Sequence, residues 1–253
     1  MKVQLLRHAT LLITINGKRI LVDPMLGAAE SMPPIDNSPN NHWNPLVELS
    51  IQLDFDQDID GVLLTHTHRD HFDDAAAKQI PPNKPILCQP EDEEKLKNLG
   101  FLKIYPIRDR LCWEGIMMQR TGGQHGTGEI GTQMGPVSGY VLQAEGEPSL
   151  YIAGDSIYCE DVTGALVLYE PSVVIVNAGG ARFTVGDPIT MTAKDVMKVC
   201  RKAPKATIIA VHMEAINHCL ESRAALYTSL EQEGLMNQVY IPMDGELLTF
   251  PLS

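Results

Sequence analysis

Residues 65–74 read THTHRDHFDD and place three histidines and three aspartates within ten positions. They follow the apolar run 61–64 (GVLL), which is predicted to be a buried strand. His66 and His68 are two positions apart, and in an extended chain such side chains point to the same face. The spacing therefore allows both imidazoles to bind one cation at the end of a strand.

Asp70 and His71 come next, where the chain leaves the predicted strand, so their side chains can face a second cation. Imidazole and carboxylate are ligands of Zn²⁺, Mn²⁺ and Fe²⁺. A structural zinc site more often contains cysteine, and no cysteine lies near this stretch, which favours a catalytic site that holds water. The alternative is a solvated polar loop. Four ligand-type residues within six positions make a metal site the preferred interpretation.

The remaining polar residues of the stretch are not expected to bind metal. Asp73 and Asp74 begin a predicted short helix, 73–79, where acidic side chains stabilise the N-terminal dipole. Thr65 and Thr67 alternate with the histidines and are predicted to face away from them.

The composition describes an acidic chain with enough apolar residues for a sizeable core. Its 253 residues carry a net charge of −12, and 44% of them are hydrophobic. This acidity disfavours binding along a phosphate backbone, so nucleic acid is not expected as a partner. We expect one domain over residues 1–253 and leave a homo-oligomer open.

Cysteine usage and hydropathy predict a soluble cytoplasmic protein. The five cysteines form no CxxC pair, and their odd number argues against a disulfide framework. Arg7, His8 and Asn16 interrupt the first apolar stretch, so no signal peptide is expected. No segment reaches the ~20 apolar residues of a membrane span.

Strand patterns dominate the first half of the chain, and strands alternate with helices in the second. Residues 3–15 are predicted to form one strand that pairs with residues 18–24 through an Asn16-Gly17 turn. Residues 27–45 are predicted to form a long loop. Residues 238–250 are predicted to form a final β-hairpin. Helices are also predicted at 91–100, 161–169, 192–203 and 222–234, and strands at 85–90, 115–123, 138–144, 148–156, 172–180 and 206–212. This order predicts an α/β fold of two sheets with helices outside them.

Three further polar residues follow apolar strands. His125 comes after Thr121-Gly122-Gly123, Asp155 lies in YIAGDS, and His212 ends ATIIAVH. Open sheets place functional groups at such strand ends. A lone histidine at a strand end more often forms hydrogen bonds than binds a metal. These three residues are therefore assigned to the site only on the basis of a family resemblance.

The ordered motifs resemble those of the metallo-β-lactamase superfamily. Asp23 in LVDP matches the first motif, and residues 66–71 (HTHRDH) match the second. His125, Asp155 and His212 follow in order as the third, fourth and fifth motifs. The resemblance implies a four-layer αββα sandwich of two mixed β-sheets flanked by helices.

The resemblance also implies a dinuclear metal site. Its ligands would be His66, His68 and His125 at the first metal, Asp70, His71 and His212 at the second, and Asp155 between them. Two divalent ions are expected, with zinc preferred and manganese or iron as alternatives. Asp23 would hold a ligand histidine from behind.

The opening residues narrow the branch of the superfamily. RHATLLITINGKRILVDP is similar to the branch that contains ascorbate-6-phosphate lactonase and the phospholipase D-like phosphodiesterases. In that branch, a histidine like His8 belongs to a GHxS/T motif near the N-terminus. In this chain Arg7 replaces the usual glycine of the motif. Lactam-hydrolysing members lack the equivalent of His71 or of Asp155, whereas this chain contains both residues. Flavo-diiron members carry glutamate at the position of His68.

These observations predict a metal-dependent hydrolase. A hydroxide bound by two metals would cleave an ester, lactone or phosphodiester in a small molecule, with Asp70 orienting the nucleophile or accepting its proton. One alternative is an iron-dependent oxidoreductase on the same scaffold, similar to a sulfur dioxygenase. Another is a non-catalytic metal-binding protein.

Candidate substrate contacts follow the later strands. Arg182 is predicted to hold a carboxylate or phosphate through its guanidinium fork, although a structural ion pair is equally compatible. Asn177, which follows its strand, is expected at the mouth of the pocket, and Glu214, just after His212, is a further candidate contact with substrate. The substrate is accordingly expected to be small, and anionic if Arg182 binds it.

His218 is predicted to act as a general acid or to contact substrate, and a supporting role behind the ligands is the alternative. In and beside the loop 27–45, Met25, Met32 and Trp43 are predicted to form an apolar lid or ordinary cover over the sheet.

Overall fold

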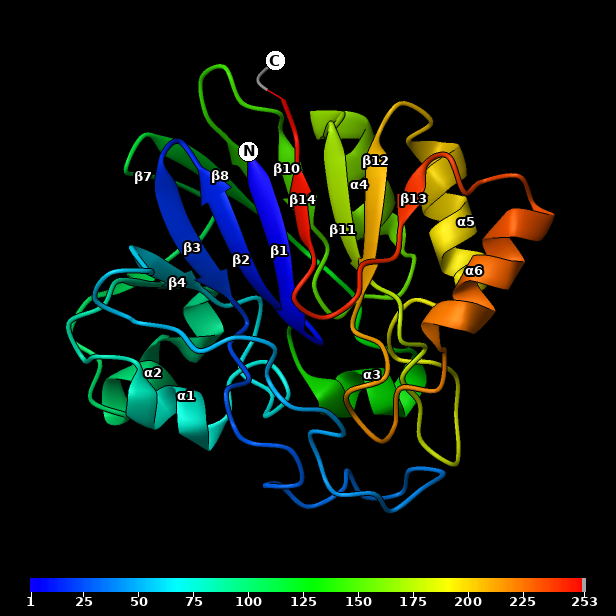
Figure 1. Ribbon diagram of the computed structural model, residues 1–253, viewed down its shortest axis with the longest axis horizontal. Coiled ribbons are helices and arrows are strands. Elements are labelled where there is room, and N and C mark those ends of the chain that lie inside the picture. The colour runs from blue at the N-terminus through cyan, green and yellow to red at the C-terminus, as the bar shows by residue number, and fades with distance from the viewer. Residues whose placement is uncertain (252–253) are drawn as a thin grey trace.

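The computed structural model describes residues 1–251 and arranges them around two seven-stranded sheets (Figure 1). The first sheet is mixed: the pairs among β14, β1, β2 and β3 are antiparallel, and β3 to β6 run parallel. Its strands, in spatial order, are β14 (Leu247–Thr249), β1 (Lys2–Arg7), β2 (Thr10–Ile15), β3 (Lys18–Val22), β4 (Gly61–Leu63), β5 (Ile86–Cys88) and β6 (Ile104–Pro106).

The second sheet is also mixed. Its β7 to β10 pairs are antiparallel, whereas β10 to β13 run parallel. Its strands, in spatial order, are β13 (Val239–Tyr240), β12 (Thr207–Val211), β11 (Val173–Asn177), β10 (Leu150–Ile152), β9 (Gly139–Gln143), β8 (Ile116–Thr121) and β7 (Arg110–Trp113).

The largest apolar core lies between the two sheets. Alternate residues of each strand point inward, so Leu5, Ile13 and Ile20 of the first sheet share one buried cluster with Leu142 and Ile175 of the second. Several outward-facing residues of the same strands are also apolar, among them Leu6, Leu12 and Leu21 of the first sheet and Val141 and Val174 of the second, so each sheet is covered on its other face.

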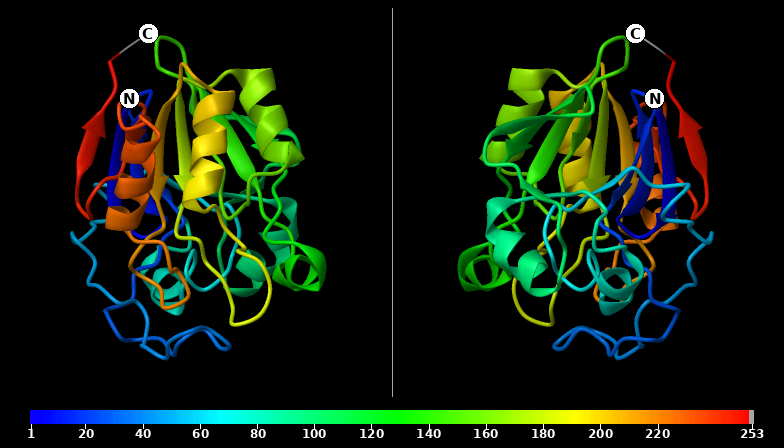
Figure 2. Two further views of the ribbon diagram at one scale, coloured as in Figure 1. Left: turned by 90° about the vertical axis from the view of Figure 1, so that its right-hand side faces the viewer. Right: turned by 90° about the vertical axis from the view of Figure 1, so that its left-hand side faces the viewer.

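Helices provide these covers and complete the four layers, which confirms the predicted αββα sandwich (Figure 2). On the first sheet, α1 (Asp74–Gln79) and α2 (Glu93–Asn98) contribute Ala76 and Leu96 to one cluster. On the second, α4 (Glu160–Tyr169), α5 (Ala193–Lys202) and α6 (Arg223–Gln232) contribute to another. Thr192 begins α5, where its amide and its hydroxyl both donate to the carboxylate of Asp195. Ser222 begins α6, where its hydroxyl accepts from the amide of Ala225.

The first predicted strand is wrong in one respect. Residues 3–15 do not form a single strand, because the chain turns at His8 and Ala9 between β1 and β2. His8 has φ of 60°, a backbone conformation that reverses the chain. The turn contains neither glycine nor proline, so the local sequence carried no signal for it.

The predicted C-terminal hairpin is also wrong. β13 pairs with β12 in the second sheet, whereas β14 pairs with β1 in the first. The segment between them crosses from one sheet to the other. Three further elements were not predicted: strand β6, which pairs with β5, strand β7, which pairs with β8, and the short helix α3 (Gly128–Met134).

The long segment after β3 is irregular, as predicted for residues 27–45. Its one bridge joins Met32 and Asn44, and it lies in blue at the end of the molecule where α3 also lies (Figure 1). Within residues 1–251, none of the helices combines the length and the apolar character that crossing a membrane requires.

Candidate metal centre

The histidines and aspartates of the motifs meet at one end of the sandwich because each follows the end of a strand. The chain reaches residues 66–71 just after β4, His125 after β8, and Asp155 after β10. His212 follows β12, and its amide donates to the carbonyl of His8 in the turn between β1 and β2. Both sheets therefore contribute to a single cluster.

His66, His68 and His125 form one group of potential ligands, with one nitrogen from each within 4.8 Å of the others. Nε2 of His66 lies 3.0 Å from Nδ1 of His68. Two imidazole nitrogens at this separation need either a shared proton or a cation between them. The expected convergence of the HxH pair and His125 is thus present.

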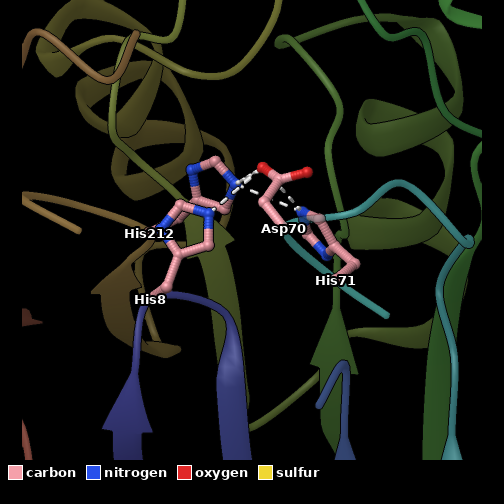
Figure 3. Close-up of side chains that lie close together, drawn as sticks. All are labelled: His8, Asp70, His71 and His212. Carbon is pink, nitrogen blue, oxygen red and sulfur yellow. Dashed lines mark hydrogen bonds and ion pairs between the residues drawn. The ribbon is translucent and has the colours of Figure 1, made fainter. Parts of the chain in front are cut away.

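Asp70, His71 and His212 form a second group, and His8 joins it (Figure 3). Nε2 of His71 lies 3.2 Å from Nε2 of His212. Oδ2 of Asp70 lies 3.8 Å from Nε2 of His71 and 3.6 Å from Nε2 of His212. One carboxylate oxygen and two imidazole nitrogens thus face one point.

Asp155 lies between the two groups. Its Oδ2 is 3.2 Å from Nε2 of His71, 3.5 Å from Nε2 of His125 and 4.0 Å from Nε2 of His66. Its Oδ1 is 3.2 Å from Nε2 of His212. A single carboxylate therefore reaches histidines of both groups, which is the arrangement that a bridging ligand requires.

The charge around this cluster suits cations. Among the ion pairs of residues 1–251, Asp23, Asp70 and Asp155 pair only with histidines, and no lysine or arginine approaches them within 4 Å. Burial opposes protonation of His71, but Asp155, Asp23 and Asp70 together raise its pKa to about 10. Burial lowers the pKa of His66 well below its usual value, which favours the neutral imidazole that binds metal. The donor set and its negative potential fit divalent metal ions.

Behind the ligands, hydrogen bonds fix the ring orientations. Oδ2 of Asp23 lies 2.9 Å from Nδ1 of His71, the position expected for this residue. Nδ1 of His125 lies 2.8 Å from the carbonyl oxygen of Ile189. Each contact leaves Nε2 of its histidine free to face the cluster.

Two supporting side chains were missed in the sequence. Thr65 does not face away: its Oγ1 donates to Asp23 at 2.6 Å and lies 3.1 Å from Nδ1 of His66. Sγ of Cys219 lies 3.5 Å from Nδ1 of His212. Thr67 does face away, toward Asp92 at 2.7 Å. The histidine spacing revealed the ligands but not their supporting contacts.

His8 is fully buried beside the second group. Its Nε2 lies 3.3 Å from Oδ2 of Asp70, and its ring centre lies 3.6 Å from that of His212. Burial, followed by the neighbouring His212, lowers the pKa of His8 to about 3. With its proton on Nε2, a neutral His8 donates to Asp70 and orients this carboxylate; Figure 3 shows the contact between the two side chains.

The residues predicted to contact substrate have other partners. Nδ2 of Asn177 donates to Oδ1 of Asp155 at 2.6 Å, so Asn177 orients a potential ligand rather than lining the pocket mouth. Glu214 forms an ion pair with Arg223 at 2.6 Å. Arg182 lines a separate cavity that contains none of the candidate ligands. Strand ends indicate where a residue lies but not which way it points.

His218 is buried and lies in neither group of ligands. Its Nδ1 has no hydrogen-bond partner among the described residues. Its backbone carbonyl accepts from the amide of Arg182 at 3.0 Å. The imidazole thus keeps an uncommitted nitrogen.

Two mixed sheets between helices, with this His/Asp cluster at the strand ends, define a metallo-β-lactamase fold. Residues 18–213 match the family model of the beta-lactamase superfamily domain, and the chain belongs to that family. It is 35% identical to the UPF0173 protein YddR of Bacillus subtilis (strain 168), over 99% of this chain and 100% of the relative. A UPF0173 metal-dependent hydrolase of Azorhizobium caulinodans is 25% identical over 97% of this chain and 98% of the relative. The chain is thus a member of a family of metal-dependent hydrolases.

Solved structures agree with this family. The isothiocyanate hydrolase from Delia radicum gut bacteria is 35% identical, with a TM-score of 0.95 over 99% of this chain and 100% of that chain. A possible metal-dependent hydrolase from Veillonella parvula DSM 2008 is 32% identical, also with a TM-score of 0.95, over 99% of each chain.

Proposed function

We propose that this protein is a hydrolase with two divalent metal ions, which attacks an electrophilic carbon of a small molecule with activated water. The observation that carries the proposal is the position of Asp155, whose carboxylate lies within 4.0 Å of histidines from both ligand groups. His66, His68 and His125 would hold one ion, and Asp70, His71 and His212 the other. Zinc is the preferred metal because imidazole and carboxylate form its usual catalytic sites.

Bound divalent ions lower the pKa of water toward ~7 and polarise the substrate. The protein supplies orientation. Asp23, Cys219 and the carbonyl of Ile189 support the ligand histidines from behind, and Asn177 holds Asp155. Oδ2 of Asp70 would help to hold the second ion and lies 3.3 Å from Nε2 of His8, so its Oδ1 can orient the nucleophile or accept its proton. His218, whose Nδ1 is uncommitted, is the candidate donor of a proton to the leaving group.

An isothiocyanate is the first substrate to test, because a structure at 35% identity and full coverage belongs to an isothiocyanate hydrolase. In R–N=C=S the central carbon is electrophilic. Water adds to this carbon to give a thiocarbamate, whose C–N bond then breaks to release the amine R–NH₂ and carbonyl sulfide. Both protons of the water end on the amine. Esters and lactones present a carbon that the same nucleophile attacks.

Purified protein loaded with zinc or manganese tests the proposal against allyl isothiocyanate, an aliphatic lactone and a phosphodiester, with oxygen consumption recorded in parallel. We expect amine release from the isothiocyanate without oxygen uptake. Asp155→Ala should reduce the rate by more than about 100-fold, since loss of a ligand exceeds the 10–100-fold effect of losing a supporting contact.

Asp74→Asn is the matched control, because Asp74 lies in the same stretch but is exposed and outside the cluster. Its rate should equal that of the unmodified protein. If protein that contains two metal equivalents hydrolyses none of the substrates, the proposal is contradicted. Oxygen uptake would favour an oxidoreductase.

A further inference from the structure

A cavity of about 240 Å³ lies beside the candidate ligand Asp70. It lies between the loop 32–36 on one side and Ile216, from the segment after His212, on the other. Its apolar walls are formed by Met32, Pro33, Pro34, Ile35 and Ile216. Asp70 is therefore at the boundary between an apolar pocket and the cluster.

The size and charge of this cavity restrict what it can hold. Sites for drug-sized ligands are about 300–1,000 Å³, so this cavity suits a smaller molecule. The single cationic residue of its lining is Arg69, which is exposed and lies 3.7 Å from Asp74. Asp36 and Asp70 add two carboxylates to the lining. An anionic substrate has little to bind here, whereas an uncharged molecule with an apolar substituent matches the walls.

The loop that forms one wall is held by Asn217, which is completely buried. Its Oδ1 accepts from the amide of Ile35 at 3.0 Å and from Nδ2 of Asn44 at 2.9 Å. Its Nδ2 donates to the carbonyl of Asn40 at 2.8 Å and to the hydroxyl of Ser38. One side chain thus uses both ends of its amide to shape residues 35–44, which gives the pocket a fixed wall before substrate arrives.

We propose that the cavity between Met32, Ile35 and Ile216 is the specificity pocket, that it takes the apolar substituent of a small uncharged electrophile, and that Asn217 positions its wall. The inference rests on the proposed hydrolase function and names the substrate class of the same site. The reacting carbon would lie at the Asp70 end and the substituent among the apolar walls. Asn217 is a positioning residue, since its contacts are with the loop.

A series of methyl, propyl and hexyl isothiocyanates tests the pocket in the metal-loaded protein. A methylene accommodated in an apolar pocket is worth about 10-fold or more, so kcat/KM should rise from methyl to propyl by at least that factor. Ile35→Phe fills the cavity, and it should lower kcat/KM for hexyl at least tenfold while methyl changes less than twofold. Val167→Phe is the control, because it adds the same ring at a separate cavity on α4.

A binding measurement separates the pocket from the reaction. Saturation-transfer NMR with unreactive 1-butanol should detect binding to the unmodified protein and to Val167→Phe, but not to Ile35→Phe. Loss of this binding without any isothiocyanate turnover would support the pocket and contradict the proposed function. Equal losses of kcat/KM for methyl and hexyl, or unchanged butanol binding in Ile35→Phe, would overturn the pocket.

Asn217→Ala tests the positioning role. Hydrogen exchange at the Ile35 amide should accelerate, KM for propyl isothiocyanate should rise and kcat should change little, with both metal equivalents retained. Asn237→Ala, at an exposed asparagine, should change none of these. Unchanged exchange and KM in Asn217→Ala would exclude the role.

Discussion

Asp23 connects the residues behind the cluster. Its Oδ1 accepts from the amide of Thr65 at 2.8 Å, and its Oδ2 lies 2.9 Å from Nδ1 of His71. Asp23→Asn preserves the shape but replaces one acceptor with a donor, which then opposes the N–H of Thr65 or of His71. We expect the affinity for the metal held by His71 to fall about 10–100-fold, as is usual when a supporting contact is lost. Competition with a chromophoric chelator measures this affinity.

Asp92→Asn is the control for this substitution. Asp92 is also a buried carboxylate that accepts from a threonine, Thr67, but it contacts no candidate ligand. Its variant should keep both metal affinities. If Asp23→Asn binds two equivalents as tightly as the unmodified protein, the orienting role is wrong.

Residues in close sequence proximity were the easiest part of the cluster to predict. His66, His68 and Asp70 lie within five positions, so local spacing alone indicates a metal site. His125 is isolated in the sequence, and only the family resemblance marked it. Cys219 carried no signal, because its contact with His212 depends on how the chain folds after β12.

At the scale of elements, Arg7 joins the first strand to the irregular segment. Its guanidinium is buried and donates to the carbonyls of Met25, Gly27 and Val47. Arg7→Leu leaves these three acceptors unpaired, and each such loss of a bond to a charged group costs about 1.5–3 kcal/mol before relaxation. Because water can reach part of the segment, we expect the free energy of unfolding to fall by about 2–4 kcal/mol.

Urea unfolding measures this change. Arg201→Leu is the control, since Arg201 is mostly exposed and its ion pair with Glu233 lies on the surface. Its effect should stay within about 0.5 kcal/mol. Equal stability of the two variants would show that Arg7 does not anchor the segment.

The element order was predictable where apolar strands and capped helices alternate, as from β10 to α6. The errors occur where pairing is not local. A two-residue turn at His8 without glycine or proline has no sequence signature, and β14 pairs with β1 from the opposite end of the chain. Short-range patterns indicate that 247–249 is extended but not which sheet receives it.

At the scale of the whole molecule, the cluster joins the two sheets. Its candidate ligands span positions 66 to 212 and follow strands of both sheets. In the metal-free protein the carboxylates Asp23, Asp70 and Asp155 are buried without a lysine or arginine partner. Bound cations would therefore stabilise the packing of one sheet against the other.

Metal removal should accordingly lower Tm. A ligand that binds only the folded state stabilises it by about 2.7 kcal/mol at 100 times its Kd, and two sites add their contributions. For a chain of this length, at about 2–4 °C per kcal/mol, the two sites together correspond to a rise in Tm of about 10–20 °C. Calorimetry of chelator-treated protein with and without added zinc measures the shift. Asp155→Ala, which removes the carboxylate between the groups, should show a smaller shift, and Asp74→Asn should show the full one. A Tm independent of zinc in protein that binds two equivalents would contradict the structural role of the ions, because binding restricted to the folded state must raise its stability.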